Sequence, residues 1–182
     1  MNEHNIEWNY PWVGKVSCFK TGLLKSAYQT ENPKARIACA LSHYLLWKRC
    51  ISLNEPILIL EHDSVFTYQL ELDTDRLNMF ILGINNPLGA TRKSREYYTS
   101  IVDNQKIIQP VPRIDNFNIP QGLAGNSAYI IKPQGAERLI KLVKEFGLWP
   151  NDALMCYQLV PKLGVTRKFY TTVQGLKSTT TL

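Results

Sequence analysis

One short apolar run constrains the fold of this chain more than any other feature. The run from Pro56 to Leu60 is continuous and rich in β-branched residues. Such runs are typical of a strand that lies in the centre of a sheet with both faces covered. The run ends abruptly in Glu61-His62-Asp63. We therefore predict a central strand with charged side chains at its carboxyl end.

A helix precedes this strand. Asn32 is a good N-cap, and Pro33 suits the first helical position, where its missing N–H costs nothing. Apolar residues then recur at helical spacing in one stripe, flanked by a second stripe that carries a histidine. The stripes are Ile37, Ala40, Leu41, Tyr44, Trp47 and Ile51, and Cys39, His43, Leu46 and Cys50. A helix that is apolar over so wide an arc is expected to be packed on two sides.

Further strands and helices alternate along the chain. The pattern predicts strands over 77–82, 128–131 and 165–172, a helix from Pro133 that stops at Gly147, and a short helix over 152–159 capped by Asn151. This alternation indicates an α/β domain in which a mostly parallel sheet is covered by helices on both faces.

The length of the chain predicts a single domain over residues 1–176. Residues 84–124 are rich in Gly, Pro, Asn and charge, and we expect them to form a mobile substrate loop. The polar tail 177–182 is expected to fray.

Composition excludes several classes of protein. With 45% hydrophobic and 20% charged residues, the chain is expected to fold. No stretch approaches the roughly 20 apolar residues of a transmembrane helix. Residues 1–10 lack an apolar signal region, so we expect a cytoplasmic protein. The net charge of +6 favours anionic partners, but no specific nucleic acid is expected, because no zinc-finger, RNP or basic-zipper pattern is present. The sequence leaves the oligomeric state open.

The four cysteines are Cys18, Cys39, Cys50 and Cys156, and in a cytoplasmic protein they are expected to be reduced thiols. Cys39 and Cys50 would lie about 16 Å apart along one helix. That separation excludes a Cys/His zinc site built from this helix alone.

The carboxylates of Glu61 and Asp63 are the most informative polar groups. Two carboxylates spaced i, i+2 at the end of a buried strand are costly to desolvate unless a cation is present. Mg²⁺ or Mn²⁺ prefers such oxygen ligands and keeps open positions for substrate phosphates. The alternative is a solvated acidic turn in which Asp63 caps the following segment. The pattern alone leaves both interpretations open.

Four segments together resemble a known family. They are ACALSHYLLW (38–47), PILILEHD (56–63), AYIIKPQGA (128–136) and PND (150–152). Their order and spacing over residues 35–160 resemble glycosyltransferase family 25, which contains the lipopolysaccharide-type β-galactosyltransferases and the collagen galactosyltransferases. The resemblance implies a GT-A-like, Rossmann-like fold. It also implies inverting transfer of a hexose, with galactose the first candidate, from a UDP-sugar to a hydroxyl of a glycan or glycosylated acceptor.

The resemblance also implies roles for individual residues. Asp63 would coordinate Mn²⁺ or Mg²⁺ on the donor diphosphate, and Glu61 would reach the metal or the ribose. Ser42 and His43 would share the donor site, although a lone histidine on an apolar face is more often a hydrogen-bonded core residue. Asn126 and Ser127 could hydrogen-bond sugar hydroxyls, and a turn explains them equally well.

Inversion needs a base that removes the acceptor proton, and Asp152 is the candidate. An Asp in the first turn of a helix is also stabilised by the helix dipole, with no catalytic duty, and a metal or donor role is a third possibility. The aromatic residues Trp47, Tyr129 and Trp149 are interpreted as core residues rather than sugar-stacking platforms.

The chain departs from the family pattern in two places. His62 stands where the family has a central Asp, which removes one negative charge from the motif. Members of the family also open with a strand and a basic residue upstream of the helix, where this chain has residues 1–31. The alternative function is therefore a catalytically inactive, N-terminally shortened GT-A-like module that binds a glycan or a protein partner.

Overall fold

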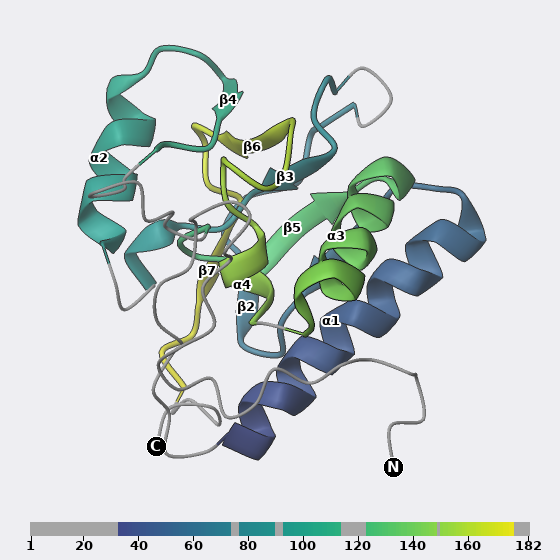
Figure 1. Cartoon of the computed structure of the whole chain (residues 1–182). Coiled ribbons are helices and arrows are strands. Elements are labelled where there is room, and N and C mark those ends of the chain that lie inside the picture. Colours follow the sequence, from purple (N-terminus) through teal and green to yellow (C-terminus); the bar gives the residue numbers. More distant parts are fainter. Residues whose placement is uncertain (1–32, 74–76, 90–92, 114–122, 149, 177–182) are drawn as a thin grey trace.

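The computed structural model describes residues 33–73, 77–89, 93–113, 123–148 and 150–176 (Figure 1). The helices are α1 (Pro33–Leu53), the short 3-10 turn η1 (Pro87–Gly89), α2 (Ser94–Asp103), α3 (Pro133–Phe146) and α4 (Asn151–Leu154). The strands are β1 (Ile57–Leu60), β2 (Ser64–Phe66), β3 (Ile81–Gly83), β4 (Ile108–Pro110), β5 (Ala128–Ile131), β6 (Leu163–Thr166) and β7 (Thr171–Val173). Within these ranges, no helix combines the length and apolar character needed to cross a membrane.

The main sheet has the order β1-β5-β3-β6-β4. β5 pairs antiparallel with both β1 and β3, β3 pairs parallel with β6, and β4 pairs antiparallel with β6. The mixed α/β class is confirmed, but the expectation of a mostly parallel sheet is wrong for the described residues. The reason is that β5 enters the sheet between β1 and β3 and runs against both. β1, β3 and β6 still share one direction, so their carboxyl ends meet at one edge.

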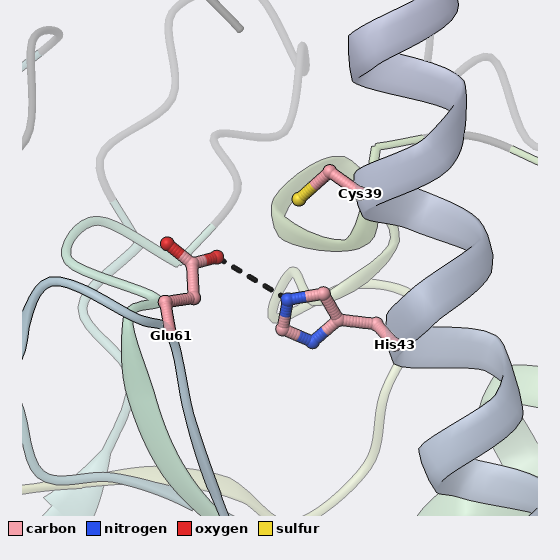
Figure 2. A group of neighbouring side chains, drawn as sticks. All are labelled: Cys39, His43 and Glu61. Atoms are coloured by element: carbon pink, nitrogen blue, oxygen red, sulfur yellow. Dashed lines mark hydrogen bonds and ion pairs between the residues drawn. The ribbon is translucent and has the colours of Figure 1, made fainter. Parts of the chain in front are cut away.

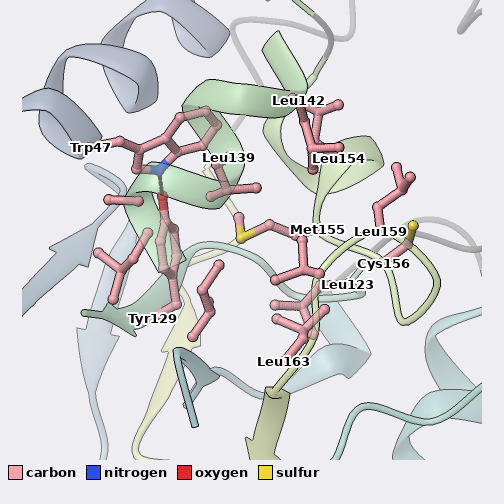
Figure 3. Packing of buried hydrophobic residues seen from close by; sticks show 14 of the residues in the cluster. Trp47, Leu123, Tyr129, Leu139, Leu142, Leu154, Met155, Cys156, Leu159 and Leu163 are labelled. Carbon is pink, nitrogen blue, oxygen red and sulfur yellow. Dashed lines mark hydrogen bonds between the residues drawn. The ribbon is translucent and has the colours of Figure 1, made fainter. Parts of the chain in front are cut away.

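Helices cover one face of this sheet. α1 and α3 lie side by side on it (Figure 1), and residues of α1, α2 and α3 join the same core cluster as Ile59, Ile81 and Tyr129 of the strands. Figure 3 shows the centre of this core, where Trp47 lies beside Tyr129 of β5 and Leu139 of α3, and Leu154 of α4 packs further along the same cluster. In the described residues, the opposite face packs against Tyr170 and non-helical segments, including Leu70, Leu72, Leu77 and Met79. The expectation of helices on both faces is therefore wrong there.

β1 is a strand as predicted, but it lies at the end of the strand order rather than in the centre. Its residues Leu58 and Leu60 are 38% and 43% exposed, because they point away from the helices. Within the described residues α1 is packed on one side, not on two sides as predicted. Its buried residues share one face, while Leu45 and Leu46 are exposed.

Other predicted elements are partly confirmed. β5 and α3 have the predicted bounds, and Gly147 ends α3 with a φ of 83°. The predicted strand over 77–82 is shorter and lies at Ile81–Gly83. The predicted strand over 165–172 is two strands, of which β7 pairs with β2 in a separate two-stranded sheet. The predicted helix over 152–159 ends at Leu154, and Asn151 is its first residue rather than its cap.

The segment 84–124 is not a plain loop. It contains η1, α2 and β4, and β4 forms the far edge of the main sheet. The segment predicted as a mobile substrate loop therefore contains regular secondary structure, and its role toward a substrate stays a prediction. Cys18, Asn32, Trp149 and the tail 177–182 lie outside the described residues.

Candidate functional site

The alternation of β1 places Glu61 on the face of the sheet that packs against α1. Side chains two residues apart in a strand share a face, so Glu61 follows Ile59 on that face. Ile59 pairs with Tyr129 of β5, and both contribute to the core under the helices. The backbone N–H of Glu61 donates to Ser127 O at 2.8 Å, which continues the pairing beyond β1. His43 of α1 is buried between Glu61 and Tyr129 and reaches both.

A chain of hydrogen bonds connects four side chains at this point. Trp47 Nε1 donates to the Tyr129 hydroxyl at 2.9 Å, and that hydroxyl lies 2.8 Å from His43 Nδ1. His43 Nε2 lies 3.2 Å from Glu61 Oε1 (Figure 2). An indole N–H can only donate, so the Tyr129 oxygen accepts from it and its own hydrogen is left for His43 Nδ1. His43 then carries its hydrogen on Nε2 and donates it to the Glu61 carboxylate.

Burial keeps the central hydroxyl protonated. Tyr129 is fully buried, which raises the pKa of its hydroxyl far above the usual value, while the hydrogen bond from Trp47 opposes the shift. A phenol that stays neutral is a hydrogen-bond donor at every physiological pH. The direction of the chain, from Trp47 toward Glu61, therefore follows from the buried tyrosine.

Cys39 lies one helical turn before His43 on α1 and faces the same space (Figure 2). The possible ligand atoms of Cys39, His43 and Glu61 all lie within 4.8 Å of one another. Thiolate, imidazole and carboxylate are the ligand types of transition-metal sites. Among the described residues this is the one group of three such side chains, and Asp63 is not part of it.

A second arrangement lies at the edge where β1 ends and β5 begins. Ser64 Oγ donates to Ser127 O at 2.7 Å, the same carbonyl that the N–H of Glu61 contacts. Asp63 stands between Glu61 and Ser64 in the sequence, and Asn126 directly precedes Ser127; Asp63 Oδ1 and both amide atoms of Asn126 are buried without a hydrogen-bond partner in the described part of the chain. Buried polar atoms are rarely left unpaired, so this edge has the character of a site that a ligand or water completes.

The predicted residues Ser42 and Asp152 are placed differently. Ser42 is exposed on α1, and its hydroxyl donates to Ala38 O at 2.9 Å, so it is not brought into the cluster around His43. Asp152 is half-buried in the first turn of α4, a helix that packs against α1. Its role stays a prediction.

A surface hollow of about 630 Å³ lies on the side of the sheet near β7. Asn86, which follows β3, and Tyr98 of α2 come from the segment 84–124. Aromatic rings and one lysine complete its lining, namely Tyr68, Phe169 and Lys168, together with threonines 67, 171 and 172. Thr171 Oγ1 donates to the buried Asn85 Oδ1 at 2.9 Å, which anchors the loop after β3 against β7.

Sequence reasoning found Glu61 and His43 individually but missed their partners. Trp47 and Tyr129 are buried as predicted for core aromatics, yet each also contributes a polar atom to the chain. In the sequence, Cys39 is part of the second stripe of the predicted helix, together with His43. The signal available in the sequence was the i, i+4, i+8 spacing of Cys39, His43 and Trp47, which puts them on one helix face.

The comparisons with known proteins bear on the central part of the chain. A family model described as "Glycosyltransferase family 25 (LPS biosynthesis protein)" matches residues 19–155. No curated protein matches the chain, and no solved structure matches it. The matched range includes α1, β1, the strand-end junction and α3.

Proposed function

The chain belongs to glycosyltransferase family 25. From that premise we propose that it moves a hexose from a UDP-sugar to a hydroxyl of a glycan or glycosylated acceptor, with galactose as the first sugar to test. The family indicates glycosyl transfer as the activity. The donor, the sugar and the need for a metal are our proposal.

The unpaired polar atoms at the strand-end junction carry this proposal. Asp63 Oδ1 and the amide of Asn126 are buried and unpartnered within the described residues, and both residues adjoin in sequence the residues that meet at the Ser127 carbonyl. Desolvating a carboxylate is costly unless a cation or a donor compensates it. A sugar diphosphate with its cation supplies both kinds of partner.

Asp63 fits an oxygen-binding divalent cation. Its unpaired carboxylate oxygen is the ligand type that Mn²⁺ and Mg²⁺ prefer. In this proposal Asp63 is the main ligand, and Glu61 reaches the metal or the ribose. When bound, such an ion would offset the negative charge of the departing diphosphate. The Asn126 amide would hold sugar or phosphate oxygens, and Ser127 shapes the edge through its carbonyl.

Asp152 is proposed as the base. The acceptor hydroxyl oxygen forms a bond to the anomeric carbon while the bond from that carbon to the diphosphate breaks, and UDP leaves with the bonding electrons. The acceptor proton passes to the Asp152 carboxylate. Aromatic rings in the hollow near β7, Tyr68, Tyr98 and Phe169, offer apolar faces against which acceptor sugar rings can pack.

Calorimetric titration of the full chain tests the proposal. UDP-galactose, UDP-glucose and UDP are titrated with and without Mn²⁺ into wild type, Asp63→Asn and Glu55→Gln. The last variant makes the same change of charge at an exposed carboxylate outside the junction. We expect Mn²⁺-dependent binding that is unchanged in Glu55→Gln. In Asp63→Asn it should weaken at least about tenfold, because the loss of even an outer partner of a metal ligand costs about 10–100-fold in metal affinity.

Two results would overturn the proposal. If no nucleotide or nucleotide sugar binds, the transferase assignment of this chain fails in favour of a module that binds a glycan or a protein partner, which the exposed His62 in place of an acidic residue favours. If binding occurs but both variants behave alike, the donor does not lie at Asp63. Release of UDP after an acceptor is added then separates binding from transfer.

A further inference from the structure

We propose that Cys39, His43 and Glu61 form a binding site for a zinc-type transition-metal ion. This site differs from the oxygen-ligand site proposed at Asp63, because of the residues assigned to that site it uses only Glu61, and the inference does not rest on the proposed glycosyl transfer. Its ligands come from two elements, the helix α1 and the end of β1, so the ion would connect them (Figure 2).

The separations of the ligand atoms fit a tetrahedral ion. His43 Nε2 and Glu61 Oε1 lie 3.2 Å apart. In a tetrahedral zinc site with metal–nitrogen and metal–oxygen bonds near 2.0–2.1 Å, two such atoms lie about 3.3 Å apart. The Cys39 sulfur lies within 4.8 Å of a His43 ring nitrogen and of a Glu61 carboxylate oxygen, so reaching the ~3.6 Å expected for a sulfur and a nitrogen ligand requires an approach of at most about 1.2 Å. Two ligands are thus already placed, and the third is close.

The donor set selects the kind of ion. A thiolate and an imidazole favour zinc, cobalt or copper over Mg²⁺ and Mn²⁺, which prefer oxygen ligands. The thiolate and the carboxylate together balance the charge of a divalent ion. The Glu61 side chain is 31% exposed and that of His43 is 5% exposed, so the ion is held mainly from inside while one side stays open to water. Three protein ligands and a fourth position for water are typical of zinc sites that are not purely structural.

The hydrogen-bond chain behind His43 provides the outer support that such sites need. On binding, the Cys39 thiol proton leaves to solvent, and the His43 hydrogen moves from Nε2 to Nδ1, so that Nε2 can bind the ion. The Tyr129 oxygen, 2.8 Å from Nδ1, then accepts that hydrogen while Trp47 continues to donate to it, and the Tyr129 hydroxyl hydrogen, which pointed to Nδ1 before, rotates away. Metal-bound histidines commonly donate their second ring N–H in this way, which orients the ring.

Cobalt spectroscopy of the full chain, without a histidine tag, tests the site. The protein is stripped with a chelator under reducing conditions and titrated with Co²⁺, which enters zinc sites and absorbs in the near ultraviolet when a thiolate binds it. We expect one Co²⁺ per chain to give a thiolate charge-transfer band together with visible bands of tetrahedral intensity, and Zn²⁺ to abolish both signals by displacing that ion. In Cys39→Ser the charge-transfer band should vanish and the affinity for Zn²⁺ should fall about tenfold or more.

Three further variants make the test specific. Cys50→Ser is the matched control, because Cys50 lies on the same helix and its thiol donates instead to Glu55 O and Ile131 O; it should behave as wild type. Glu61→Gln should keep the charge-transfer band but bind Zn²⁺ more weakly. Asp63→Asn should leave the spectrum and the affinity unchanged, even if it abolishes donor binding.

The inference is overturned if wild type shows no thiolate band with Co²⁺, or if Cys39→Ser binds Zn²⁺ as tightly as wild type. It is also overturned if Asp63→Asn rather than Cys39→Ser removes the ion, since the metal would then lie at the oxygen-ligand site of Asp63. Circular dichroism of each stripped variant confirms that the fold is retained, so that loss of metal is not read from an unfolded protein.

Discussion

Removing the Tyr129 hydroxyl should destabilise the protein far more than the loss of one oxygen atom suggests. In Tyr129→Phe the ring remains and its packing in the core is kept. The substitution, however, takes the acceptor from Trp47 Nε1 and the donor from His43 Nδ1 at the same time. Both side chains are buried, Trp47 at 0% and His43 at 4% exposure. Neither can turn to water for a replacement.

The magnitude follows from those two orphaned groups. Each buried polar group left without a partner costs about 1–3 kcal/mol, so the two together cost about 2–6 kcal/mol. Removing the buried hydroxyl recovers part of its own desolvation, and we expect a net loss near 3 kcal/mol in the free energy of unfolding. Tyr44→Phe is the matched control. Tyr44 is buried on α1, the helix that carries His43 and Trp47, and burial is the sole cause that raises the pKa of its hydroxyl. Tyr44→Phe should lose clearly less stability than Tyr129→Phe, at most about 1 kcal/mol.

Urea unfolding followed by far-ultraviolet circular dichroism measures both free energies without relying on Trp47 as the probe. Nitrogen-15 spectra of the His43 ring supply a second measurement. Wild type should show the hydrogen on Nε2, and Tyr129→Phe should lose that preference. The double variant Trp47→Phe/Tyr129→Phe should cost less than the sum of the single variants, because the two residues share one hydrogen bond. The reasoning is refuted if Tyr129→Phe is as stable as Tyr44→Phe.

Three further outcomes are expected. Gly135→Ala should lose about 1–3 kcal/mol of stability, because the added β-carbon would lie 2.6 Å from Phe80 O. Urea unfolding measures this loss, with Lys141→Ala at an exposed position of α3 as the control. An unchanged stability of Gly135→Ala would contradict the close approach of α3 to the sheet. Burial raises the pKa of the Cys50 thiol from its ordinary 9.0 to about 11. The unfolded chain therefore releases that proton first, and stability should fall as the pH rises from about 9 to about 11, by up to about 3 kcal/mol; Cys50→Ser should show a shallower decline, and equal slopes would refute the shift. Asp152→Asn should retain donor binding in calorimetry but release UDP 10²–10⁴-fold more slowly, the usual contribution of a general base; unimpaired release would remove Asp152 from that role.

The pattern of consecutive residues was sufficient to predict α1, α3 and β5. The helix α1 follows from apolar spacing after Pro33, and α3 follows from Pro133 at its start and Gly147 at its end. β5 was predicted with its exact bounds from the run 128–131. Each of these signals resides in consecutive residues, so no distant contact was needed to interpret it.

The direction and order in which the strands pair could not be predicted from such local patterns. An apolar run such as 57–60 looks alike whether its neighbour runs parallel or antiparallel, and whether it lies in the centre or at an edge. The elements in 84–124 were missed because only Tyr97 and Ile101 of α2 are buried, which leaves too short an apolar stripe to recognise, and because β4 is a short edge strand that includes Pro110. A proline costs little at an edge, where its missing N–H is not needed for pairing.

The sequence by itself determined the main helices, two strands, the membership in glycosyltransferase family 25 and the acidic turn after β1. Only the tertiary structure decided that Glu61 meets His43 and that both connect to Tyr129, which is 86 residues from His43 along the chain. The physical reason is that spacing along one helix or strand assigns a side chain to a face, whereas its partners depend on which face another element presents. The strand order, with β5 beside β1, supplied that second face.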